Sequence, residues 1–172
     1  MLDIAWHVAD RLHIPTAFGD TEMTTEEVLL RLCSKLSGVE EDRIADDLLS
    51  PEEEIRVNEA WDKIETVPFY HFNCNMLSNA ELESKVKLLQ LKHGIRLFVY
   101  DYVKIQSHEV GVGRPDLVIA GKLDTLKEKI CKQCNIPVIT SGQMYPRSDE
   151  RGQQNLFAES KAFTRLADVI CR

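Results

Sequence analysis

The sequence predicts an α/β fold with a mainly parallel sheet. Segments with strand character alternate with segments whose apolar residues recur at helical spacing, which is the pattern of βαβ units. The run Leu97–Ile105 is largely apolar and has one carboxylate, Asp101, in its middle, as expected of a strand buried within a parallel sheet. At 172 residues, the chain fits a single domain, 1–172, with a sizeable core.

Helices are predicted where apolar residues recur every three or four positions between capping residues. Thr24 with Glu27, and Ser78 with Glu81, match capping boxes, and Pro51 suits the first turn of a helix. The predicted helices cover residues 2–12, 25–37, 51–65, 78–93, 116–133 and 157–165.

Strands are predicted where short apolar runs end at turn residues. The predicted strands cover residues 14–18, 69–72, 96–100, 136–140 and 167–171. Residues 106–114 are polar and contain two glycines, so they are predicted to form a loop, and 142–155 are predicted to form a long mobile one.

The composition is that of an ordinary globular protein, with 44% hydrophobic and 28% charged residues. No apolar stretch approaches the roughly 20 residues of a membrane span, and the N-terminus lacks a signal-peptide pattern, so we expect a cytoplasmic protein without membrane contact. The net charge of −7 argues against a broad basic surface but permits a narrow path for nucleic acid. The acidic run at 40–54 is interpreted as a solvated helical surface.

Asp101 is the first candidate for chemistry. Ligands of parallel sheets bind beyond the carboxyl ends of the strands, where an acid can hold hydrated Mg²⁺ against the phosphates of a nucleotide. The alternative is an acid that caps a helix or pairs with a lysine. The chain contains no Gly-rich phosphate loop of the form G-x-x-x-x-G-K-[ST], so it carries only half of such a site.

Two further candidates follow predicted strands. Glu22 follows the first strand and could orient a water for attack on a phosphate, although Asp20 is an equally good candidate. Gln143 follows the strand at 136–140, where a neutral amide can contact a γ-phosphate. The ordinary alternatives are a surface acid near a helix start and a plain loop amide.

Three arginines lie in the two predicted loops that leave the same sheet edge as Asp101: Arg114, Arg147 and Arg151. They could contact nucleic-acid phosphates, or be plain surface residues. Cys131 and Cys134 form a C-x-x-C pattern near the end of a predicted helix, whereas redox motifs belong at helix starts. Half-buried thiols are therefore favoured over a redox or zinc site.

Four short motifs occur in order: D-T-E-M at 20–23, F-V-Y-D-Y at 98–102, P-V-I-T-S-G-Q at 137–143, and E-S at 159–160 followed by A-D at 167–168. In order and spacing they resemble motifs of the RecA-like motor domain of DnaB-type hexameric replicative helicases, including phage relatives. The resemblance covers nearly the whole chain.

The resemblance implies a RecA-like three-layer sandwich around a mainly parallel sheet. It makes Glu22 the catalytic base, places Asp101 in the Walker B strand as the acid that holds Mg²⁺ through water, and makes Gln143 the contact to the γ-phosphate. It implies ATP and Mg²⁺ as cofactors, and single-stranded DNA, further copies in a hexamer and replication proteins as partners. By the same resemblance, we expect the chain to begin after the Walker A loop and to stop before the arginine finger, so that the fold is incomplete at both ends.

The first hypothesis is an ATP-dependent DNA helicase core that unwinds DNA in replication by transferring a phosphoryl group to water. Because the phosphate loop is absent from these residues, we expect little or no turnover by this chain alone. The alternative is a non-catalytic RecA-like module for interaction or assembly. An in-frame G-K-[ST] upstream of Met1 in the encoding DNA would count against this module. A thiol oxidoreductase using Cys131 and Cys134 is a third hypothesis.

Overall fold

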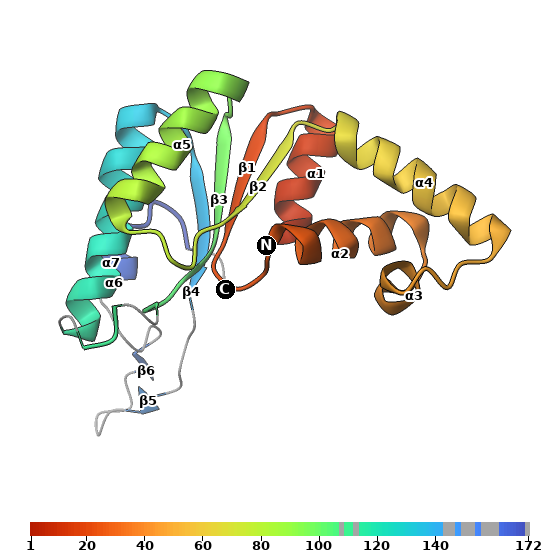
Figure 1. Ribbon diagram of the computed structural model, residues 1–172. Coiled ribbons are helices and arrows are strands. Elements are labelled where there is room, and N and C mark those ends of the chain that lie inside the picture. The colour runs from red at the N-terminus through yellow and green to blue at the C-terminus, as the bar shows by residue number, and fades with distance from the viewer. Residues whose placement is uncertain (107–108, 112–113, 143–146, 149–153, 156–161, 171–172) are drawn as a thin grey trace.

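The computed structural model describes residues 1–106, 109–111, 114–142, 147–148, 154–155 and 162–170. A four-stranded sheet lies between two groups of helices (Figure 1). The strand order is β2-β1-β3-β4 and every neighbouring pair is parallel, which confirms the predicted fold class. The four strands are β1 (Thr16–Asp20), β2 (Phe69–Asn73), β3 (Leu97–Val103) and β4 (Val138–Gly142).

Alternate side chains of the central strands enter two separate cores. On one face, Phe18 and Val99 pack with residues of α1 (Leu2–Leu12) and α2 (Thr25–Ser37). On the other face, Phe98 and Tyr100 pack under α5 (Asn79–His93), α6 (Pro115–Asp124) and the π-helix η2 (Thr125–Lys132). The sheet is therefore buried on both faces, which gives the three-layer arrangement.

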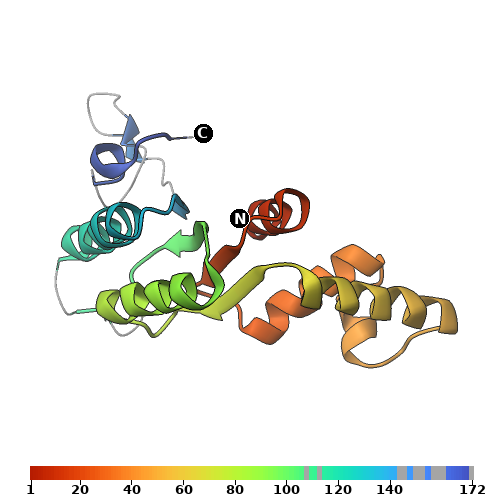
Figure 2. The same ribbon diagram turned by 90° about the horizontal axis from the view of Figure 1, so that it is seen from above.

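The helices α2, α3 (Glu41–Ala45) and α4 (Pro51–Thr66) form an arm that projects from the sheet (Figure 2). The arm has a small core of its own, formed by Cys33, Val39, Val57 and Ala60. The acidic run at 40–54 supplies α3 and the first turn of α4, and most of its acids are exposed, as expected.

Local capping signals fix the ends of several helices. Both predicted capping boxes form, and Ser50 makes a third with Glu53 at the start of α4. The left-handed glycines Gly38 and Gly94 end α2 and α5. These boundaries agree with prediction because caps depend on neighbouring residues alone.

Two strands begin two residues later than predicted, at Thr16 rather than 14 and at Val138 rather than 136. In each case a proline precedes the strand, and it has no amide hydrogen to pair. The amide of Ile14 instead donates to the Val8 carbonyl, as part of the end of α1. Conversely β3 continues to Val103, so Asp101 lies inside this strand and not beyond residue 100 as predicted.

The predicted helix 116–133 is divided. The α-helical part ends at Asp124, and η2 continues as a π-helix, which accommodates a locally wider turn. At the junction the Thr125 hydroxyl donates to the Gly121 carbonyl at 2.9 Å. Helical periodicity alone does not distinguish the two geometries.

The C-terminal third departs most from prediction. Within 142–155, predicted to be an unstructured loop, β5 (Arg147–Ser148) and β6 (Gln154–Asn155) form an antiparallel pair. The described part of the helix predicted at 157–165 is α7 (Ala162–Leu166), and 157–161 lie outside the described residues. The strand predicted at 167–171 does not form over 167–170, where Val169 is 79% exposed. A segment with strand propensity still needs a neighbouring strand to pair with.

Among the described residues, no helix is long and apolar enough to span a membrane.

Gly19 of β1 tests the packing of the sheet. A Cβ at this position would lie 3.1 Å from the Phe98 ring and 3.3 Å from the Phe72 ring, so both rings must shift. We expect Gly19→Ala to lower the free energy of unfolding by about 1–3 kcal/mol, measured by urea denaturation.

Gly121→Ala is the matched control, because its Cβ would meet only the Asn79 amide nitrogen at 3.7 Å and alanine favours a helix. The control should keep or slightly raise the stability. Equal stability of the two variants would contradict the close packing at Gly19.

Candidate active site

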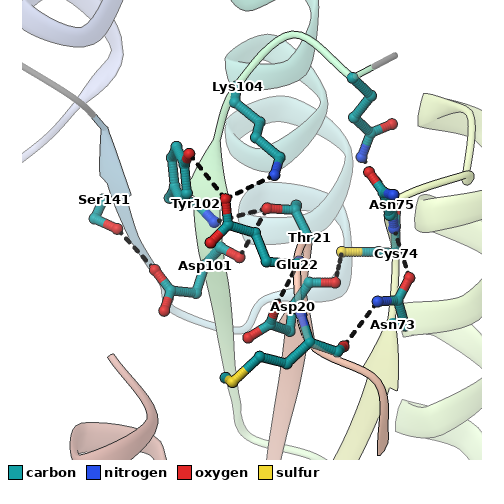
Figure 3. A network of polar contacts seen from close by, with 12 residues as sticks. Asp20, Thr21, Glu22, Asn73, Cys74, Asn75, Asp101, Tyr102, Lys104 and Ser141 are labelled. Carbon is teal, nitrogen blue, oxygen red and sulfur yellow. Dashed lines mark hydrogen bonds and ion pairs between the residues drawn. The ribbon is translucent and has the colours of Figure 1, made fainter. Parts of the chain in front are cut away.

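The pairing of β1 with β3 brings two carboxylates to the carboxyl edge of the sheet. Asp20, the last residue of β1, is in register with Asp101 of β3. Asp20 is only 3% exposed, whereas the Asp101 side chain is 25% exposed. Figure 3 shows the polar contacts around these residues. The edge therefore combines one buried acid with one that solvent can reach.

Asp20 organises the turn that follows β1. Its Oδ1 accepts hydrogen bonds from the Glu22 amide at 2.6 Å and the Met23 amide at 2.7 Å. Its carbonyl accepts from the Cys74 amide at 2.8 Å and from Cys74 Sγ at 3.1 Å. These contacts give Asp20 a structural function, although from sequence it was as good a candidate for the base as Glu22.

Thr21 joins the ends of the two strands. Its amide donates to the Asp101 carbonyl at 2.9 Å, and its hydroxyl donates to the same oxygen at 3.2 Å. The Tyr102 amide donates in turn to the Thr21 hydroxyl at 3.4 Å. The backbones that carry Glu22 and Asp101 are thereby held together at the edge.

Glu22 projects from this turn, with its side chain 58% exposed. Its Oε1 accepts from Lys104 Nζ at 3.0 Å and from the Tyr102 hydroxyl at 3.1 Å (Figure 3). The hydrogen bond from Lys104, and then that from Tyr102, lowers the pKa of Glu22 below its ordinary value. The carboxylate is therefore ionised near neutral pH.

Asp101 presents oxygen atoms suited to a hard cation. Its Oδ1 accepts from the Ser141 hydroxyl at 2.9 Å, and its Oδ2 lies 4.0 Å from the amino group of Met1, where α1 begins. Among the described residues, no cluster of three or more histidines, cysteines or acids could hold a metal. A single carboxylate with a neighbouring hydroxyl fits Mg²⁺, which keeps several waters and completes its shell with phosphate oxygens.

The other predicted residues are placed less fully. Gln143 and Arg151 lie outside the described residues, and Arg147 is described only as part of β5. Arg114 directly precedes α6, is 76% exposed, and pairs with Asp116 at 2.8 Å. Figure 1 shows the start of α6 and the pair β5–β6 on the side towards which the sheet strands run.

The cysteine pair resembles packing residues. Cys131 and Cys134 lie at the end of η2, and Cys134 is buried with its Sγ donating to the Lys129 carbonyl at 3.6 Å. Burial raises the pKa of the Cys134 thiol. A thiol with a raised pKa is a poor nucleophile, which disfavours Cys134 as the attacking thiol of an oxidoreductase.

Sequence reasoning missed Thr21, Tyr102, Lys104 and Ser141 as partners of the acids. Thr21, Tyr102 and Ser141 lie within or next to the quoted motifs, so their positions in the chain were a usable signal. Lys104 lies in the run Leu97–Ile105, which we interpreted as apolar. Because β3 continues to Val103, Lys104 is placed within hydrogen-bond distance of Glu22.

Comparisons with a family model and with known sequences match this chain to replicative DNA helicases. The family model described as "DnaB-like helicase C terminal domain" matches residues 1–171. A probable plasmid replicative DNA helicase of Chlamydia trachomatis is 24% identical over 178 residues, and a replicative DNA helicase DnaB of Buchnera aphidicola is 23% identical over 175. Each alignment covers 98% of this chain but only 38% of the relative.

Two solved structures share the fold at 20% sequence identity. One, described as an ATPase domain, superposes with a TM-score of 0.81 over 97% of this chain and 61% of that one. The other, a DnaB-like replicative helicase described with its interactions with primase, superposes with a TM-score of 0.80 over 97% of this chain and 41% of that one.

The Glu22 contacts predict a pH dependence. The pKa of Glu22 lies below 4.5 in the folded protein, so the stabilisation from Lys104 and Tyr102 is complete above pH 4.5 and is lost as the pH falls through the lowered pKa. Lys104→Met should raise the pKa of Glu22 towards 4.5, and Tyr102→Phe should raise it less, as measured by NMR titration of the carboxyl carbon.

Glu27 provides the internal control. The Thr24 amide and hydroxyl lower its pKa, so neither substitution should move it. An unchanged Glu22 pKa in Lys104→Met would show that the ion pair does not hold in solution.

Proposed function

Because the chain belongs to the DnaB-like helicase C-terminal domain family, we propose that it forms the motor core of an ATP-dependent replicative DNA helicase. The chain spans 38% of the length of the curated relatives reported above, so the activity of the whole protein is part of this proposal. The observation that carries it is the placement of Glu22 and Asp101 at one sheet edge, joined through Thr21.

In this proposal the reaction is phosphoryl transfer from ATP to water. Glu22 accepts a proton from the attacking water, because its carboxylate is exposed and ionised. The water oxygen bonds to the γ-phosphorus while the bond to the leaving ADP oxygen breaks. Asp101, oriented by the Ser141 hydroxyl, would hold Mg²⁺ through water. Mg²⁺ bound there would neutralise charge that develops on the phosphate oxygens.

Gln143 completes the proposed set as the contact to the γ-phosphate. It follows the last residue of β4, and Ser141 of that strand already touches Asp101. The residues that cradle the other phosphates are not among these 172, since the sequence contains no G-K-[ST]. We therefore propose that this chain alone binds nucleotide weakly and turns over little.

The proposed partners are single-stranded DNA, further copies of the chain in a hexamer, and other replication proteins, with the cytoplasm as the place of action. Arg114, Arg147 and Arg151 are the proposed contacts to DNA phosphates. Support comes from the position of the start of α6 and of β5 on the side towards which the strands run (Figure 1). A non-catalytic assembly module on the same fold is the alternative.

Nucleotide titration tests the motor proposal. We expect Mg·ATP to bind more weakly than micromolar, with NMR shifts in the millimolar range centred on Glu22, Asp101 and Ser141. Asp101→Asn should abolish the part of these shifts that needs Mg²⁺, and Glu26→Gln, which changes an exposed acid on α2, should retain it.

The results separate the hypotheses. Micromolar affinity by calorimetry would contradict the expected weakness, while an absence of shifts at this edge would favour the assembly module. Shifts centred elsewhere on the protein would overturn the placement of the site.

Binding of DNA tests the arginines. In fluorescence anisotropy with an oligothymidylate, Arg114→Ala should weaken binding and reduce the slope of log affinity against log salt by about one, because one phosphate contact is lost. Arg56→Ala, which removes an exposed arginine on the distant α4, is the control. Equal effects of the two substitutions would remove Arg114 from the proposed DNA contacts.

A further inference from the structure

A series of polar contacts connects the end of β1 to α6. Its members are Asp20, Cys74, Gln106, Glu109 and Lys122. Three of its members are almost fully buried: Cys74 and Gln106 are each 1% exposed and Lys122 is 3% exposed. Buried polar groups are costly unless they are paired, so such a series indicates a specific structural demand.

The first half of the series joins β1 to the residues after β3. The carbonyl of Asp20 accepts from the amide and the thiol of Cys74. The carbonyl of Cys74 accepts from Gln106 Nε2 at 2.9 Å. The turn that carries Glu22 and the segment after β3 are therefore tied to the same residue, Cys74.

The second half joins that segment to α6. The backbone amide of Gln106 donates to Glu109 Oε2 at 2.8 Å. The other carboxylate oxygen, Glu109 Oε1, lies 2.8 Å from Lys122 Nζ. The Glu109 side chain is only 16% exposed. Because breaking one side of a buried ion pair leaves an uncompensated charge, this pair resists separation more than a surface pair does.

Arg114 lies between the two ends of this ion pair in the sequence, five residues after Glu109 and eight before Lys122. The ion pair thus joins the two residues that flank Arg114 in the sequence, Glu109 and Lys122. Fixing both ends of a short segment restricts the conformations open to it.

We propose that Gln106, Glu109 and Lys122 are positioning residues, whose contacts fix the chain on both sides of Arg114 so that Arg114 is presented at the start of α6. The proposal rests on the proposed function in one respect, that Arg114 contacts DNA. The hydrogen-bonded tie itself is independent of that function. None of the three residues needs to touch DNA or nucleotide.

A double-mutant cycle tests the tie. Lys122→Met and Glu109→Gln each leave an unpaired buried group, whereas the double variant restores neutrality. By hydrogen exchange, we expect the amides of Gln106 and of residues 109–111 to exchange faster in each single variant, and to recover part of their protection in the double variant. Thermal denaturation of each variant shows whether the protein remains folded.

The same variants are then titrated with a labelled oligothymidylate. We expect each single substitution to weaken binding by about tenfold, with partial recovery in the double variant. Mg·ATP-induced shifts at Asp101 should persist, because neither Glu109 nor Lys122 contacts Asp101 or its partner Ser141. Partial rescue by the double variant distinguishes positioning from loss of a direct Lys122 contact, which the double variant would not rescue.

The control cycle uses Lys132→Met and Glu128→Gln, an exposed pair of the same residue types on η2, which should change neither exchange nor DNA binding. Unchanged exchange in Lys122→Met, or faster exchange with unaltered DNA affinity, would overturn the proposal. If the unsubstituted protein binds no oligothymidylate, the proposed DNA contact of Arg114 is wrong, and so is the proposal that these residues present Arg114 to DNA. The hydrogen-exchange measurements on the double-mutant cycle still decide whether Glu109 and Lys122 hold the chain together.

Discussion

The parallel pairing of β1 with β3 is the constraint on which the candidate site depends. It sets Asp20 beside Asp101, and Thr21 continues the pairing one residue beyond β1 through its amide and hydroxyl. Glu22 follows directly, so its distance from Asp101 is limited by strand geometry and not by a flexible loop. A one-residue slip of β1 against β3 would turn Phe18 from one core to the other, so the two cores protect the site geometry.

Four acids of this chain lie in four different environments. Asp20 is buried and accepts two amide hydrogen bonds, so it fixes a turn. Glu22 is exposed and paired with Lys104, and Asp101 is half-buried beside a hydroxyl. Glu109 is enclosed with Lys122. The same carboxylate chemistry thus supplies a turn cap, a candidate base, a candidate metal ligand and half of a structural ion pair.

The series of polar contacts through Cys74 and Gln106 gives the edge a rigid support. It lies in the core under α6, where water does not compete for its hydrogen bonds. The turn after β1 and the segment after β3 consequently share one anchoring residue. These contacts connect the turn after β1 to Glu109 and Lys122, the two residues that flank Arg114 in the sequence.

The sequence by itself determined the parts of this protein that depend on neighbouring residues. The capping boxes at Thr24 and Ser78, the α/β alternation, and the position of Glu22 just after a strand could all be predicted, because caps and periodicity are local properties. The absence of a strand over 167–170 could not be predicted, because a strand needs a pairing partner supplied by a distant segment. Nor could the division of the helix at Thr125, because helical periodicity does not distinguish an α-helix from a π-helix. Only the tertiary structure could decide that Asp20 lies in register with Asp101, that Lys104 pairs with Glu22, and that Lys122 is buried against Glu109, because each of these contacts joins residues that are far apart in the sequence or lie in different elements.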